Sequence, residues 1–161
     1  MRSLIFPFWL LMALGLSSSA SASGKIFWGS RAGMSVTVIH MSGLSTPNAI
    51  IRTKHTHEDA ISFCREYVGK ITPLCIREQL AIPLNDAIEA NCPAGEFTNF
   101  QGSRFSFQGE NKDRKEFQPK YIIKDLANGD ILDGSSASGY PVLAQIFKAL
   151  CPKQAPYDIE G

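Results

Sequence analysis

The cysteines at positions 64, 75, 92 and 151 constrain this 161-residue chain more than any other feature. An even number of cysteines in an exported protein indicates disulfides, and four cysteines allow three different pairings. Their spacings of 11, 17 and 59 residues lack the paired short spacings of a structural zinc site. We favour a Cys64–Cys75 bond across a short turn and a Cys92–Cys151 bond that closes a long loop. Each bond would stabilise the fold by roughly 2–4 kcal/mol.

The expectation of export comes from the first 22 residues. Arg2 supplies a positive start, residues 4–16 form an uncharged apolar run, and Ala20-Ser21-Ala22 fits the small-x-small rule for signal cleavage. The apolar run is shorter than the ~20 residues needed to cross a bilayer. Residues 1–22 are therefore predicted to be a cleaved secretory signal peptide. The mature chain, cut near Ala22, is expected in the periplasm or outside the cell, with no membrane span.

The charge balance of the mature chain excludes one class of partner. The full chain has 16 basic and 15 acidic side chains, and Arg2 is the only charged residue of the predicted signal. The remaining 139 residues thus carry 15 charges of each sign, so their net charge is zero. Nucleic-acid-binding proteins usually carry a basic excess, and no nucleic-acid partner is predicted here. A chain of this length suits a single domain.

The first half of the mature chain predicts one hairpin followed by helices. Residues 34–41 and 49–54 are rich in β-branched side chains and flank a loop, as in a hairpin. Thr56 is a good helix cap with Asp59 three residues later, and Gly69 is a natural helix end. The apolar positions of this helix include Tyr67 and Val68, which are expected on its buried face.

Thr72 followed by Pro73 predicts a second helix start. Residues 74–92 have a helical composition, so one bent helix or two short helices are expected there, interrupted at Pro83.

The second half predicts hairpins and a final helix. Residues 96–109 suggest one hairpin turning at Gly102, and Asn128-Gly129 is a strong hairpin-turn signal between two β-like runs. Residues 140–151 place apolar side chains on one helical face. The predicted domain, residues 23–151, is therefore a small α+β domain of antiparallel hairpins packed with two to four helices. Residues 152–161 are expected to form a loose C-terminal tail.

Metal and carboxylate chemistry find little support in the pattern. In a hairpin, His40 would lie next to the loop and His55 at the far end, about 20 Å apart. His55 and His57 flank the Thr56 cap and are expected to diverge. The acidic residues near predicted strand ends form no clear glycosidase pair, because turns use aspartate for backbone hydrogen bonds; they are Glu96, Asp125, Asp130 and Asp133. No metal ion or cofactor is predicted.

The stretch from Leu132 to Tyr140, LDGSSASGY, is the main candidate site. Its Gly134–Ser138 part fails the nucleophile-elbow pattern G-x-S-x-G at the last position. Ser138 is expected to cap the final helix, so that Ser138→Ala would cost ~1 kcal/mol. The anion- or ligand-binding candidates lie at this junction and in a basic stretch that leads into the first helix; they are Ser135, Ser136, Ser138, Arg52 and Lys54.

Two function classes remain open. Because each enzyme pattern fails on spacing or context, the sequence favours a non-catalytic binding or interaction module. Its expected partner is a protein or an envelope component. The alternative is a small exported hydrolase with its site around Ser135–Ser138 and a histidine brought in by the fold.

Overall fold

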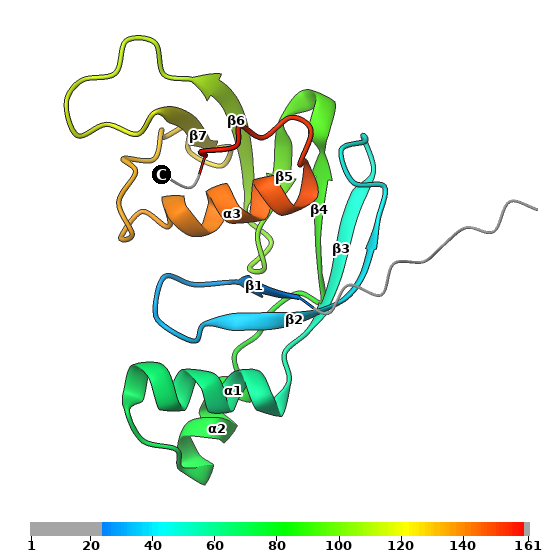
Figure 1. Ribbon diagram of the computed structural model, residues 1–161, viewed down its shortest axis with the longest axis vertical. Coiled ribbons are helices and arrows are strands. Elements are labelled where there is room, and N and C mark those ends of the chain that lie inside the picture. The colour runs from blue at the N-terminus through cyan, green and yellow to red at the C-terminus, as the bar shows by residue number, and fades with distance from the viewer. Residues whose placement is uncertain (1–23, 160–161) are drawn as a thin grey trace, which may run out of the picture.

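The computed structural model describes residues 24–159, which form an antiparallel sheet whose strand order follows the chain (Figure 1). The predicted signal peptide lies outside these residues. Every neighbouring pair of strands is antiparallel, so the sheet is a meander. Its seven strands are β1 Lys25–Phe27, β2 Ser35–Ser42, β3 Ala49–Lys54, β4 Ala87–Asn91, β5 Glu96–Thr98, β6 Arg104–Glu110 and β7 Tyr121–Asp125.

Helix α3, Tyr140–Leu150, packs against one face of this curled sheet and closes the core (Figure 1). Its buried positions recur at helical spacing, as the sequence predicts, while Val142 is only half-buried. The Phe147 ring stacks on Phe107, with centroids 4.6 Å apart, and contacts Phe97 at 5.3 Å. The small α+β class is therefore confirmed, with one sheet face covered by α3 and much of the other face open.

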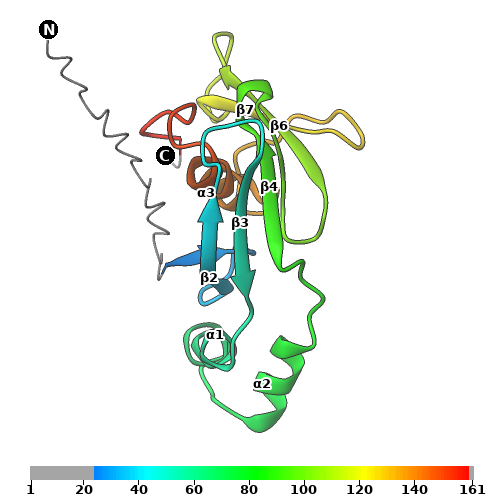
Figure 2. The same ribbon diagram turned by 90° about the vertical axis from the view of Figure 1, so that its right-hand side faces the viewer.

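Two further helices are inserted between β3 and β4 and project from one end of the sheet (Figures 1 and 2). Helix α1, His57–Phe63, begins with the predicted capping box of Thr56 and Asp59. It continues as a π-helical turn, Cys64–Val68, and ends at Gly69, which has φ 76°. Helix α2, Pro73–Leu80, begins at the predicted Thr72 cap. We call the segment from His57 to Leu80 the helical lobe.

The cysteines pair at disulfide distance in the favoured pattern. Cys64 and Cys75, whose Cα atoms are 6.1 Å apart, join the two halves of the helical lobe. Cys92 and Cys151, 5.4 Å apart at Cα, join the end of β4 to the end of α3 inside the core. Among residues 24–159, no helix combines the length and apolar character needed to cross a membrane.

The predicted helix over residues 74–92 is wrong beyond Leu80. Residues 87–91 form β4, a central strand of the sheet. Pro83 prevents the helix from continuing, and the residues after it alternate between core and solvent. Ile88 lies opposite Ile51 and Ala90 lies opposite Phe97, so both strand neighbours contribute to the register.

The hairpin predicted over residues 96–109 is present as β5 and β6, but the one at Asn128-Gly129 is incomplete. The turn forms, with Gly129 at φ 83° and its N–H donating to the carbonyl of Asp125. The residues after this turn form a single β-bridge, between Ile131 and Lys124, and do not form a strand.

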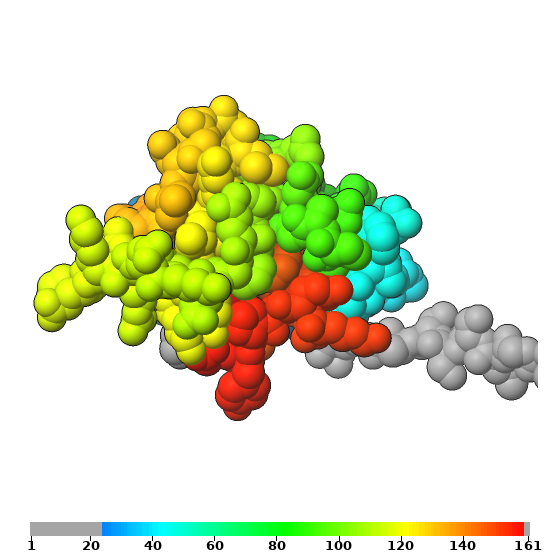
Figure 3. All heavy atoms as spheres, turned by 90° about the horizontal axis from the view of Figure 1, so that it is seen from above, coloured from blue at the N-terminus to red at the C-terminus, as the bar shows by residue number. Residues whose placement is uncertain are grey.

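The segment after α3 is anchored, in contrast to the predicted loose tail. Ile159 is buried in the core, and Asp158 accepts hydrogen bonds from Lys120 at 2.7 Å and from the Tyr121 hydroxyl at 2.6 Å. Lys120 and the Tyr121 hydroxyl lower the pKa of Asp158 to about 2. Viewed from above, the charged loop between β6 and β7 also projects from the body of the molecule (Figure 3, yellow-green).

Candidate functional site

The predicted serine site folds as a self-contained turn. The amide of Ser135 donates to Asp133 Oδ1 at 2.8 Å, and the amide of Ser138 donates to Ser135 Oγ at 3.2 Å. The Ser138 hydroxyl donates back to the Ser135 carbonyl at 2.8 Å. Two hydrogen bonds from Ser135 lower the pKa of Asp133, and the one from its side chain has a larger effect than the one from its backbone. The hydroxyls of Ser135 and Ser138 therefore bond within the turn itself.

Ser138 does not cap α3, so that expectation is wrong. The N-cap residue is Gly139, which has φ 78° and no side chain to accept a hydrogen bond. A Ser138 cap would require the helix to begin at Gly139, but it begins at Tyr140. Gly139, in the left-handed region, ends the serine turn, and its amide donates to the Ser136 carbonyl. The predicted cost of Ser138→Ala as a lost cap therefore has no basis in the structure.

Arg52 and Lys54 do not join the serines. Both are exposed on β3, where residues alternate between the two faces of the sheet. Ile51 is buried in the core beneath α3, so Arg52 lies on the opposite, open face. The serine turn leads into α3 on the covered side, and the five candidate ligand residues thus form no single site.

The histidines are also separate from the serines. His40 lies on β2 opposite Arg52, the His55 ring contacts Trp28 with centroids 6.2 Å apart, and His57 is exposed at the start of α1. Within residues 24–159, no hydrogen bond joins a histidine to the serine turn. The same part of the chain contains no group of three or more His, Cys, Asp or Glu side chains suited to a metal ion.

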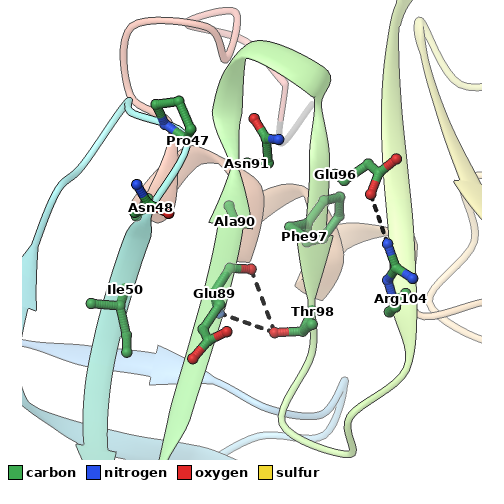
Figure 4. A pocket seen from close by; sticks show the side chains of 11 residues that line it. Pro47, Asn48, Ile50, Glu89, Ala90, Asn91, Glu96, Phe97, Thr98 and Arg104 are labelled. Atoms are coloured by element: carbon green, nitrogen blue, oxygen red, sulfur yellow. Dashed lines mark hydrogen bonds and ion pairs between the residues drawn. The ribbon is translucent and has the colours of Figure 1, made fainter.

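A shallow groove of about 430 Å³ crosses the open face over β3 to β6 (Figure 4). Two pairs of its polar groups bond to each other. Arg104 Nη2 donates to Glu96 Oε2 at 2.8 Å, and the Thr98 hydroxyl accepts from the Glu89 amide at 3.0 Å. Of the four carboxylate candidates, Glu96 lines the groove, whereas Asp125 and Asp130 accept hydrogen bonds in the turn after β7 and Asp133 in the serine turn. This groove is best described as a solvated sheet face.

The helical lobe carries the more unusual surface. Four large apolar side chains at its outer end are between 49% and 54% exposed. They lie within or just beside the π-helical turn and the first turn of α2, and we call them the apolar tip: Tyr67, Val68, Ile71 and Leu74. Helix α2 has no buried residue, so it contributes apolar surface without a core of its own. Large exposed apolar side chains grouped in one short segment are candidates for an interaction surface.

The structure holds the apolar tip in place from two sides. All four residues lie between Cys64 and Cys75, so the disulfide closes the short loop that contains them. The Tyr67 ring packs on Phe63 at 5.3 Å, and the Arg31 guanidinium lies 4.8 Å from the centre of the Tyr67 ring. The tip is therefore ordered by covalent and aromatic contacts and not by burial.

Helical spacing does not predict this surface, because it places Tyr67 and Val68 on a buried helix face, whereas both are half exposed. The helix widens into a π-helical turn at Cys64, and no other element covers the residues that follow. The sequence does contain one signal for an exposed apolar surface, namely several apolar residues between two cysteines only 11 positions apart. A loop that short cannot bury four large side chains within itself.

Searches against protein-family models, curated proteins and solved structures found no match for this chain.

Proposed function

We propose that this protein is an exported, non-catalytic interaction module that binds a partner protein through the apolar tip. The observation that carries the proposal is the half-exposure of four large apolar side chains on a lobe closed by a disulfide. Burying such side chains on binding is favourable by ~25 cal/mol per Å² of apolar surface. A surface that is already ordered loses less entropy on association than a flexible one.

The arrangement of polar groups supports binding over catalysis. The serine turn uses its hydroxyls locally, and none of the three histidines bonds to it within residues 24–159. The alternative of a serine hydrolase therefore has less support. Export is proposed from the sequence of residues 1–22, and two cysteine pairs at disulfide distance are compatible with it.

The partner can be sought with a photo-crosslinking residue at position 71, introduced in cells that express the protein. The same residue at position 131, an exposed isoleucine near β7, provides the control. We expect one protein to be crosslinked from position 71 and not from position 131. That protein, once purified, should bind the wild-type chain in a titration.

The decisive variant is Leu74→Glu, because a carboxylate near the N-terminus of α2 is compatible with the helix dipole. It should weaken binding of the purified partner by about tenfold or more, whereas Leu126→Glu, the same change at an exposed position far from the lobe, should not. Equal binding by both variants would contradict the proposal. So would a crosslink from position 71 to a second copy of the chain alone.

A further inference from the structure

A second surface feature lies beside the helical lobe, between the β1–β2 loop and the start of α3. It is a groove of about 370 Å³, within the size range of small-molecule sites. One wall is formed by Phe27, on edge strand β1, and Ala32, and the other by Pro141 and Val142. Arg31 also lines it, and we call it the Arg31 groove.

The two walls of the groove are tied together by hydrogen bonds. The Phe27 amide donates to Gln145 Oε1 at 3.0 Å, and the Ser30 hydroxyl donates to the Ser136 carbonyl at 2.9 Å. On its other side the loop packs closely on the end of α1, since a Cβ atom at Gly33 would meet the Phe63 backbone at 2.6 Å. The groove is therefore preformed, which reduces the entropy lost when a ligand binds.

The groove is apolar, but it is bordered by one cation. Phe27, which lines it, is 43% exposed overall, a large fraction for an aromatic residue. Arg31 forms no ion pair with any residue in 24–159, and its guanidinium lies over the Tyr67 ring. A guanidinium that uses its face on an aromatic ring keeps its in-plane N–H groups for a planar acceptor. Carboxylate is a planar acceptor of opposite charge that matches this geometry.

We infer that the Arg31 groove binds a small monocarboxylate that carries one aromatic or branched aliphatic group. The apolar group packs between Phe27 and Val142, and the carboxylate accepts hydrogen bonds from Arg31. No covalent step is involved. This site does not depend on the partner-binding role of the apolar tip.

The test is a titration of the isotope-labelled, disulfide-bonded protein with phenylacetate, followed by two-dimensional NMR. We expect saturable shifts of the amides of Phe27, Val142 and Gln145 at millimolar concentrations. Phenylacetamide, which has the same ring and shape but no charge, should bind about tenfold more weakly. Arg31→Gln should lower the affinity for phenylacetate by a similar factor. The control Arg114→Gln, on the exposed β6–β7 loop, should leave the affinity unchanged.

Three results would overturn the inference. They are an absence of shifts at millimolar phenylacetate, shifts confined to residues outside the groove, and equal affinity for the acid and the amide. Because Arg31 also contacts Tyr67, the spectrum of Arg31→Gln without ligand serves as a check of folding. A second variant, Val142→Glu, leaves Arg31 unsubstituted and places a negative charge in the groove. It should abolish binding of phenylacetate. Neither titration requires the partner protein, so failure here leaves the apolar tip to be judged by its own experiment.

Discussion

Lys25 Nζ lies 3.0 Å from Oδ1 of Asp59, and this ion pair joins the edge strand β1 to the first turn of α1. The Asp59 side chain is fully buried, whereas that of Lys25 is about half exposed. The carboxylate also accepts hydrogen bonds from the Thr56 amide at 2.9 Å, the Thr56 hydroxyl at 2.7 Å and the Thr37 hydroxyl. Asp59 therefore connects the helical lobe to two strands of the sheet.

Replacement of Asp59 by alanine should destabilise the protein by about 3 kcal/mol. The change removes half of the capping box and leaves partly buried donors of Thr56 and Thr37 without an acceptor. Lys25→Ala should cost less than about 1 kcal/mol, because its ammonium group is partly solvated. Urea denaturation with the disulfides intact measures both free energies of unfolding. Equal losses for the two variants would show that the buried hydrogen bonds of Asp59 contribute little.

Stability should fall as the pH drops below about 6.5. Burial lowers the pKa of His55 from its usual 6.5, while Asp59 opposes this shift, and His55 Nδ1 is buried without a hydrogen-bond partner in residues 24–159. The unfolded chain therefore takes up a proton at His55 before the folded chain does, and acid favours unfolding. His55→Gln should reduce the pH dependence of the free energy of unfolding below pH 6.5, measured by urea denaturation. An unchanged profile in His55→Gln would contradict this assignment.

Asp59 should act in a lower pH range. Burial alone would raise the pKa of Asp59, but hydrogen bonds from Thr56, Lys25 and Thr37 outweigh burial and hold it below 3.8. Its stabilisation is complete above that value and is lost as the pH falls through the lowered pKa. The difference in unfolding free energy between wild type and Asp59→Asn should therefore shrink only below about pH 4. A difference that shrinks near neutral pH would argue against a lowered pKa.

Removal of the Cys64–Cys75 bond should loosen the helical lobe more than the sheet. Helix α2 buries no residue and depends on the bond for its position. The variant Cys64→Ala/Cys75→Ala should lose about 2–4 kcal/mol, mostly as local opening. Hydrogen exchange should accelerate for α2 amides while those of β3 and β4 remain protected. Unchanged protection of α2 would mean that its contacts with α1 suffice.

Two glycines with similar backbone angles should respond differently to alanine. Gly33 and Gly69 have φ values of 75° and 76°, so both strain a substituted residue by about 1 kcal/mol. A Cβ atom at Gly33 would also meet the Phe63 backbone at 2.6 Å, whereas one at Gly69 meets no atom within 4 Å. Gly33→Ala should therefore lower the melting temperature clearly more than Gly69→Ala. Equal shifts would show that the loop moves to relieve the clash.

Local signals explain why much of the fold could be predicted. The Thr56–Asp59 capping box, the Thr72-Pro73 start and the β2–β3 hairpin each depend on residues a few positions apart. The number of cysteines predicts two disulfides, and the favoured one of the three possible pairings is the one at disulfide distance in the structure. The candidate site could not be predicted in the same way, since Arg52 and the serine turn are separated by the thickness of the sheet.

The sequence by itself determined the starts of α1 and α2, most of the turns and the apolar face of the last helix, because short-range sterics and hydrogen bonds specify them. Tertiary structure decided that residues 87–91 are a strand, because pairing with β3 and β5 outweighs a helical composition. It also decided which apolar residues are covered. Val68 and Phe147 are both apolar helical residues, but only Phe147 faces a sheet, and the exposure of Val68 depends on the absence of a packed neighbour within residues 24–159.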